Sequence, residues 1–234
     1  SLGHGGFMAI GAYSGALFTL FAGKHTGLPD FLIFLLGIII GGVVAALFGV
    51  IIGIPVLRLR GDYLAIVTLA FGEIIRSVIN FLGVTGGSKG LSGIPRYTNY
   101  KWTYAIVIIT LVLLSNFVKS RYGRAISSIR DNYIAAESIG IKVSRYKILA
   151  FVIAAFFAGV AGVLFGHNFS ILKPGSFDYN KSVEILVFVV LGGMGSIKGS
   201  VISATVLTLL PEFLRGASNY RMLLYALALI LIML

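Results

Sequence analysis

The sequence contains no cysteine, which excludes a disulfide-stabilised fold and any metal site built on thiolates. It has three histidines, His4, His25 and His167, and they are too widely spaced to match a metal-ligand pattern. We expect interfacial polar roles for His4 and His167, which fall near the ends of apolar runs. Charged residues are also scarce, at 12% of the chain, against roughly 25% in soluble domains. These gaps argue against a metal centre, a soluble enzyme and a disordered chain.

Apolar residues are abundant. They make up 58% of the 234 residues, which is more than a soluble fold of this size can hide from water. The 30 glycines, beside only five prolines, fit closely packed helices in lipid better than a linker. The sequence therefore predicts an all-α, polytopic transmembrane bundle. It begins at Ser1 without a methionine and ends within an apolar run, so we expect a single domain, 1–234, that is incomplete at both ends.

A bilayer core of about 30 Å requires about 20 helical residues. About eight hydrophobic segments come near that length or form short halves of it, and we expect helices over them: 5–23, 31–57, 63–82, 102–118, 148–166, 183–192, 197–210 and 222–234. The glycine-rich break at 192–196 leaves open whether 183–210 is two spans or a re-entrant hairpin.

Basic residues indicate the orientation, because Lys and Arg gather in cytoplasmic loops. The polar connection 119–147 holds seven basic residues against two acidic ones, a net charge of +5 out of +11 for the chain. We place this connection in the cytoplasm. The connections 24–30, 83–101 and 167–182 then fall outside, although Lys89, Arg96 and Lys101 make the second a mild exception. The net charge is explained by contact with anionic lipid, and no nucleic-acid motif accompanies it.

The connection 119–147 also shows helical periodicity. Apolar residues recur at spacings of three and four over 123–140, which predicts one amphipathic helix, with Gly140 as its C-cap. The stripe consists of Ile126, Ile129, Tyr133, Ala136 and Ile139. Such a helix suits docking into a partner, and a surface-lying or purely connective role stays open.

Part of this connection resembles the EAA loop of ABC importer permeases, whose pattern is Glu-Ala-Ala followed by three residues and Gly. Ala135, Ala136 and Gly140 fit the pattern. Ile134 stands where the pattern has Glu, and Glu137 keeps an acidic group nearby.

The wider sequence resembles the LivM-type permease subunits of branched-chain amino acid ABC importers. The likeness is carried, in order, by SLGHGGFMAIGAY (1–13), RLRGDYLAIVTLAFGEIIR (58–76), TGGSKGLSGIP (85–95), GRAISSIRDNYIAAESIGIKVSRYKILAF (123–151) and VLGGMGSIKG (190–199). The resemblance implies a non-enzymatic, multi-pass permease of a bacterial or archaeal cytoplasmic membrane that translocates Leu, Ile and Val.

The resemblance further implies four kinds of partner. These are a second, related permease subunit, two cytoplasmic ATP-binding subunits, an extracytoplasmic amino-acid-binding protein and the lipid bilayer. This chain would then hold no cofactor, because ATP would be bound by the partner subunits. The residues expected to couple to the ATPases are Arg124, Arg130, Asp131, Ala135, Ala136, Glu137 and Gly140.

Glu73 and Arg76 are charged residues within the apolar segment 63–82. At helical rise, Glu73 lies about 16 Å beyond Asp62, near the bilayer midplane, where a charge must be paired or wet. Arg76 is three residues further on and can pair with it. The two form either a structural ion pair or part of the translocation path, and a proton relay is a third interpretation.

Two glycine-rich stretches remain. The stretch 85–93 fails the phosphate-loop pattern, because Ser88 precedes Lys89 and Gly90 follows it. It is either a flexible turn or, through Gly86, Gly87 and Lys89, part of an outer mouth. Gly192 and Gly193 interrupt an apolar stretch, as broken helices beside a transport path do, and a plain turn fits them equally.

Other functions stay open at this point. Related permeases import urea or short amides. A secondary transporter driven by an ion or proton gradient would depend on Glu73 as its coupling acid. A channel is disfavoured, because it gives the connection 119–147 no role.

Overall fold

A computed structural model describes residues 1–59 and 61–213. Five of its helices are long and apolar enough to cross a bilayer: α1 (His4–His25), α2 (Asp30–Val56), α3 (Asp62–Phe81), α4 (Tyr100–Lys119) and α7 (Val143–Phe169). Each coincides with a predicted segment, so the all-α polytopic fold is confirmed. The predicted segment 222–234 lies outside the described residues. The chain forms two compact units, Ser1–Ser182 and a second one that begins at Val183.

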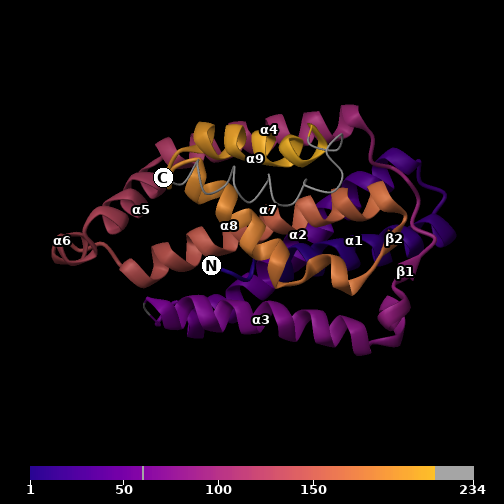
Figure 1. The fold of residues 1–234 in the computed structure, drawn as a ribbon, viewed down its shortest axis with the longest axis horizontal. Coiled ribbons are helices and arrows are strands. Elements are labelled where there is room, and N and C mark those ends of the chain that lie inside the picture. Colours follow the sequence, from indigo (N-terminus) through magenta and orange to yellow (C-terminus); the bar gives the residue numbers. More distant parts are fainter. Residues whose placement is uncertain (60, 214–234) are drawn as a thin grey trace. The chain divides into compact units, whose positions relative to one another are not determined.

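Helices α1, α2 and α7 form the core of the first unit, and small residues bring their backbones together (Figure 1). A side chain at Gly11 would overlap the backbone of Gly159, and one at Gly162 would overlap the carbonyl of Met8. Between helices in lipid, where water gives no hydrophobic drive, such close contact is a main source of attraction. The high glycine content therefore serves this three-helix core.

Helix α3 joins the core through a second glycine contact. A Cβ on Gly6 of α1 would lie 2.9 Å from the Cα of Gly72 of α3. The amide of Leu2 donates a hydrogen bond of 3.0 Å to the Thr68 hydroxyl, which is buried on α3. Helix α4, by contrast, has no buried residue along its whole length. Its Trp102 and Ile106 pack against the core, and the exposed remainder of its surface faces lipid or a partner.

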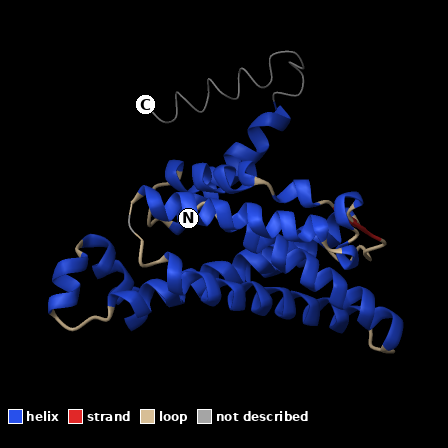
Figure 2. Ribbon diagram, turned by 90° about the horizontal axis from the view of Figure 1, so that it is seen from below, coloured by secondary structure: helices blue, strands red, loops and turns tan. Residues whose placement is uncertain are grey.

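The first unit carries different structures at its two ends (Figures 1 and 2). One end holds two short 3₁₀ turns, η1 (Gly83–Thr85) and η2 (Gly87–Lys89), and the strands β1 (Leu91–Ser92) and β2 (Ile171–Leu172). The strands pair antiparallel, with Leu91 opposite Leu172, and a further 3₁₀ turn, η3 (Pro174–Phe177), follows them. The opposite end holds the short helices α5 (Arg121–Asp131) and α6 (Tyr133–Ser138).

The second unit contains most of α8 (Tyr179–Leu191) and all of α9 (Ile197–Phe213). The turn between these helices uses Gly193 and Gly195, both at positive φ, and the Ser196 hydroxyl accepts a hydrogen bond of 3.0 Å from the amide of Gly199. At about 20 Å, the 13 residues of α8 are shorter than a bilayer core.

Candidate functional site

The helix predicted over 123–140 is wrong as a single element. The structure breaks it at Asn132, whose backbone is extended, with φ −156° and ψ 103°. The Asn132 side chain accepts hydrogen bonds from the amides of Ile134 and Ala135, at 3.0 and 3.1 Å, and so begins α6 as a new helix. The predicted docking element is therefore a helix pair, α5 and α6, joined at a capped corner.

The corner also divides the predicted apolar stripe. Ile126 and Ile129 of α5 face the bundle across a cavity of about 450 Å³, which Leu57, Leu64 and Phe151 line from the other side. On α6 only Ala136 is buried, whereas Ile139 beyond it is 76% exposed. Ile134, which lies off the predicted stripe, is 64% exposed. The tip of the α5–α6 pair thus presents apolar side chains away from the bundle.

The turn after α6 has a defined geometry. Gly140 has a φ of +88°, its amide donates to the carbonyl of Glu137, and the amide of Ile141 donates to the carbonyl of Ala136. This pattern is the Schellman motif, in which a left-handed residue ends a helix and satisfies its last carbonyls. The predicted C-cap role of Gly140 is confirmed, and it sets the direction in which the chain returns to α7.

Most of the remaining coupling candidates are exposed on the α5–α6 pair. The Arg124 guanidinium donates to the carbonyl of Lys119 at 2.8 Å and so fastens α5 to the end of α4. Arg130 and Asp131 form a solvent-exposed ion pair of 3.0 Å. Ala135 and Glu137 are exposed on α6. These side chains lie on one small projection, where a partner could contact them together.

Glu73 and Arg76 form the expected ion pair on α3. Both the Nη2 and the Nε of Arg76 approach Oε2 of Glu73, at 2.6 and 2.8 Å. Within the described residues, the other carboxylate oxygen has no partner. The side chains are 30% exposed for Glu73 and 39% for Arg76. The pair therefore lies at the edge of the α3 packing face, where a partner subunit or a water-filled path could reach it.

The outer-mouth candidates lie on the two turns that follow α3. Gly86 and Gly87 both have positive φ, and a side chain on Gly86 would overlap the carbonyl of Gly90. The buried Thr85 hydroxyl is 2.5 Å from the carbonyl of Ile79 and 2.6 Å from that of Leu82. Lys89 is exposed at the end of the second turn. This segment is therefore a set of built turns, in which glycine is required by the backbone.

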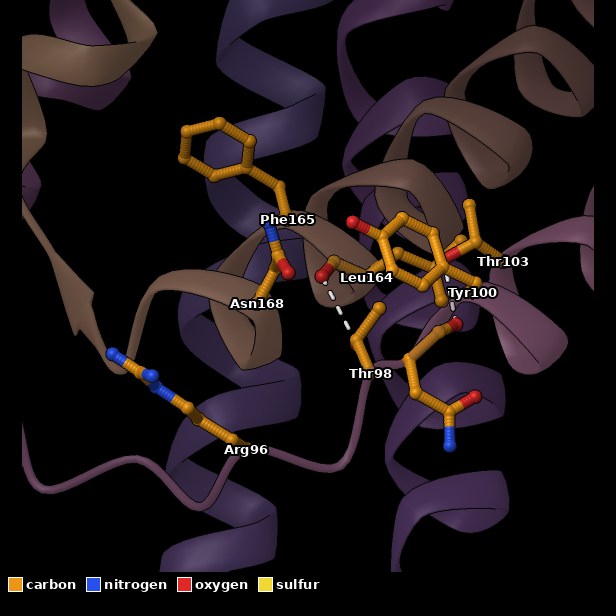
Figure 3. A pocket seen from close by; sticks show the side chains of 8 residues that line it. Arg96, Thr98, Tyr100, Thr103, Leu164, Phe165 and Asn168 are labelled. Atoms are coloured by element: carbon orange, nitrogen blue, oxygen red, sulfur yellow. Dashed lines mark hydrogen bonds between the residues drawn. The ribbon is translucent and has the colours of Figure 1, made fainter.

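A polar cavity of about 570 Å³ lies at the same end of the unit, between the start of α4 and the last turns of α7 (Figure 3). Its walls include Thr98, Asn99 and Asn168, with Arg96 at the rim. Arg96 donates to the Ser170 hydroxyl at 2.8 Å, and Thr98 donates to the carbonyl of Leu164 at 3.1 Å. Sequence reasoning missed this cavity, because its residues come from two segments about 70 positions apart.

Beside that cavity, a polar network runs from the buried His167 to the exposed Asp30. The expected interfacial role of His167 is wrong, because its side chain is fully buried and its Nε2 lies 2.9 Å from the buried Thr19 hydroxyl. Tyr97 stacks on the His167 ring, and its hydroxyl donates to a carboxylate oxygen of Asp30 at 3.1 Å. Partial burial, together with this bond to Asp30, raises the pKa of the Tyr97 phenol. The network fastens the segment before α4 onto the three-helix core.

Gly192 and Gly193 lie at the turn of the second unit. A side chain on Gly192 would overlap the backbone of Gly199 and Ser200, and Gly193 has a φ of +86°. Gly192, Gly199, Ser203 and Leu207 help to line a cavity of about 270 Å³ between α8 and α9. The structure thus shows a tight, glycine-dependent helical turn with a small adjoining hollow.

In residues 1–59 and 61–213, no group of three or more His, Asp or Glu side chains gathers as metal ligands would. The described features are instead apolar spans, a projecting helix pair and a turn-rich end. Together they define a multi-pass α-helical membrane protein.

Comparison with known proteins gives the family. The family model described as branched-chain amino acid transport system / permease component matches residues 1–234, and the chain belongs to this family of transport permeases. The chain is 38% identical to the high-affinity branched-chain amino acid transport system permease protein LivM of Salmonella typhimurium, over 99% of this chain and 61% of that protein.

More distant relatives fit the same family. LivH of Escherichia coli, a permease of the same kind of system, is 28% identical over 55% of this chain and 47% of its own length. A probable LivM of Methanocaldococcus jannaschii is 25% identical over 71% of this chain and 52% of its own length. The chain thus spans about three fifths of the length of its LivM relatives from Salmonella typhimurium and Escherichia coli. No solved structure matches it.

Proposed function

We propose that this chain is a membrane-spanning subunit of an ATP-driven importer of branched-chain amino acids. The structural observation that carries the proposal is the α5–α6 pair, which holds exposed Ile134 and Ile139 at a rigidly capped tip. An apolar tip on a charged projection is costly in water and suits a groove in a partner protein. The relatives named LivM and LivH support the substrate class.

The proposed partners follow from the two ends of the unit. The connection 119–147 lies in the cytoplasm, where its net charge of +5 is favoured, and it docks on a separate ATP-binding subunit. ATP is bound by that subunit, and this chain holds no cofactor. The turns at Gly86, Gly87 and Lys89 face an extracytoplasmic binding protein. A related permease of the LivH kind completes the pathway.

Energy reaches the membrane through the α5–α6 pair. When two ATP-binding subunits close, they displace α6 through its apolar tip. The bond from Arg124 to the carbonyl of Lys119 passes this displacement to the end of α4, and the short return through Gly140 passes it to α7. The bundle then alternates between outward-open and inward-open states.

In the translocation path, the Glu73–Arg76 pair offers complementary charges to an amino-acid zwitterion. The free oxygen of Glu73 can accept a hydrogen bond from the ammonium group, and Arg76 can turn toward the carboxylate. Beyond Asp62 at its start, α3 carries no acidic residue other than Glu73, so this helix offers no chain of acids for a proton relay. This favours the ATP-driven importer over a proton-coupled secondary transporter. We place Gly192 and Gly193 beside the path as well.

Isolation of the full-length protein in mild detergent, followed by mass spectrometry, tests the proposal first. Recovery of a second permease and of an ATP-binding subunit is expected, together with uptake of leucine, isoleucine and valine that requires ATP. A lone protein whose uptake stops when the ion gradient collapses would overturn the proposal in favour of a secondary transporter. Uptake of urea or short amides alone would overturn the substrate class but not the ATP-driven mechanism.

A further inference from the structure

A second cavity, of about 430 Å³, lies on the 119–147 side of the unit, where α7 begins. It is lined by Tyr122 from α5, by Ile139, Gly140 and Ile141 of the turn after α6, and by residues of the first turns of α7. The α7 residues are Lys142, Arg145, Tyr146 and Leu149. The cavity shares Ile139 and Gly140 with the α5–α6 pair, whereas the proposed transport cycle assigns no role to its α7 side chains.

The lining of this cavity has a distinct order along α7. Lys142 and Arg145 are exposed at its upper rim, and the rings of Tyr122 and Tyr146 lie 6.4 Å apart below them. Leu149, one turn further into the apolar part of α7, forms the floor. Along α7, charged groups are therefore followed by an aromatic ring and then by an aliphatic side chain, which is the order of groups at a membrane interface.

The charge at the rim is uncompensated. Within residues 1–59 and 61–213, neither Lys142 nor Arg145 forms an ion pair. Arg121 adds a third cation, with its guanidinium 5.0 Å from the centre of the Tyr122 ring. Lys142 and Arg145 lie at the N-terminus of α7, the positive end of the helix dipole, where cations are unfavourable without an anion. The first turn of α7 contains no acidic residue that could supply one.

We infer that this cavity binds the phosphate headgroup of an anionic lipid, with Lys142 and Arg145 as the phosphate-binding side chains. The tyrosine rings would flank the glycerol region, and Leu149 would contact the start of an acyl chain. Basic pockets on the cytoplasmic side between membrane helices are favourable sites for acidic lipids. The inference rests on the proposed function only for placing 119–147 at the cytoplasmic surface.

A partner protein is a less suitable occupant. Of the two exposed apolar side chains at the tip of α6, only Ile139 reaches the edge of this cavity, whereas Leu149 belongs to a membrane span. A lipid alone satisfies both the rim charge and the floor, because it carries an anionic headgroup directly above a hydrocarbon chain.

Native mass spectrometry of the full-length protein tests the inference, using release from nanodiscs of equal parts phosphatidylglycerol and phosphatidylcholine. The wild type should retain phosphatidylglycerol preferentially, and K142A/R145A should lower that preference about thirtyfold, at ~1 kcal/mol per basic residue. Lys119→Ala is the matched control for Lys142→Ala, because both are exposed lysines of the same connection and only Lys142 lines the cavity. Leu149→Trp fills the floor without changing charge and should also lower retention.

Four results would overturn the inference. The first is equal retention of the two lipids by the wild type, and the second is an equal effect of Lys119→Ala and Lys142→Ala, which indicates diffuse surface charge. The third is cross-linking of position 142 to the ATP-binding subunit without lipid preference, which would assign the cavity to a protein contact. Retention of inorganic phosphate without lipid counts against it too. Because the measurement needs no ATP-binding subunit, its failure would leave the proposed transport function standing.

Discussion

The phenol ring of Tyr97 stacks on the imidazole of His167, with ring centres 5.8 Å apart and planes 16° from parallel. One residue belongs to the segment before α4, and the other is buried in the core of α1, α2 and α7. The same tyrosine reaches Asp30 at the start of α2 through its hydroxyl. A single side chain thus joins three elements at the turn-rich end of the unit.

Replacing Tyr97 with Phe keeps the stacking and removes only the bond to Asp30. We expect a loss of less than about 1 kcal/mol, because the bond is partly exposed to water. Since the pKa of Tyr97 is raised in the folded state, its contribution is fully present below the ordinary phenol value and is lost as pH rises through the folded value.

Thermal unfolding across pH is the measurement for Tyr97→Phe. The difference between wild type and variant should stay constant from about pH 6 to 9 and should shrink above about pH 10. A difference that already changes near neutral pH would show that another group controls this contact. Tyr97→Ala, which also removes the stacking, should be the more damaging change.

Gly162 should tolerate no side chain. Gly162→Ala places a methyl group against the carbonyl of Met8 and should destabilise the unit by roughly 1–3 kcal/mol through forced separation of α1 and α7. Gly23→Ala is the control, because no atom lies within 4 Å of a Cβ at Gly23, and alanine is the better helix former there. Detergent unfolding that showed equal stability of the two variants would contradict the packing described for the core.

Neutralising either Glu73 or Arg76 alone should lower the stability of the protein more than neutralising both. Glu73→Gln or Arg76→Gln leaves one charge unpaired in the membrane, whereas E73Q/R76Q leaves none. A double-mutant cycle on thermal stability should therefore show strong coupling, with the double variant closest to wild type. Additive effects would mean that the ion pair does not hold in the membrane.

Transport measured in the same three variants distinguishes a structural role of the ion pair from a role in the translocation path. A purely structural pair predicts recovery of uptake in E73Q/R76Q along with stability. A pair that contacts the substrate predicts stable protein with persistently weak uptake. Uptake that loses its dependence on an ion gradient in Glu73→Gln would support the secondary transporter.

The tip of α6 provides the sharpest test of coupling. Ile134→Asp and Ile139→Asp alter exposed positions, so they should leave folding unchanged while abolishing co-purification of the ATP-binding subunit and ATP-dependent uptake. Glu137→Arg, also at an exposed position, should abolish uptake. Ala136→Trp is unsuitable for this purpose, because Ala136 is buried and the variant would disturb the projection itself. Normal uptake in Ile134→Asp would contradict the docking role.

The shape of the α5–α6 pair depends on Gly140, and this can be tested without an ATP-binding subunit. Alanine at a φ of +88° is strained, and we expect Gly140→Ala to cost about 1 kcal/mol locally and to redirect the return to α7. Hydrogen exchange of the Glu137–Lys142 amides should become faster in this variant. Gly175→Ala, whose Cβ meets open space and whose φ is not positive, should leave those amides unchanged.

The helices could be predicted because hydropathy and length suffice for membrane spans. Helix α7 begins at Val143, earlier than the apolar run at 148, because a helix continues into the interface beyond its apolar part. The break at Asn132 was missed although a capping residue stood there, since the apolar periodicity continued across it. The Tyr97, Asp30 and His167 contact left no local signal, because its residues are far apart in sequence.

The glycine contacts of α1, α2 and α7 restrict how this subunit can move. Packed helices slide past one another through small adjustments of the side chains between them. Where two backbones touch directly, as at these glycines, no side chains lie between them to adjust. These three helices must therefore travel as one body. Any opening or closing of a passage has to occur around the trio, at its borders with helices such as α4 or with another subunit.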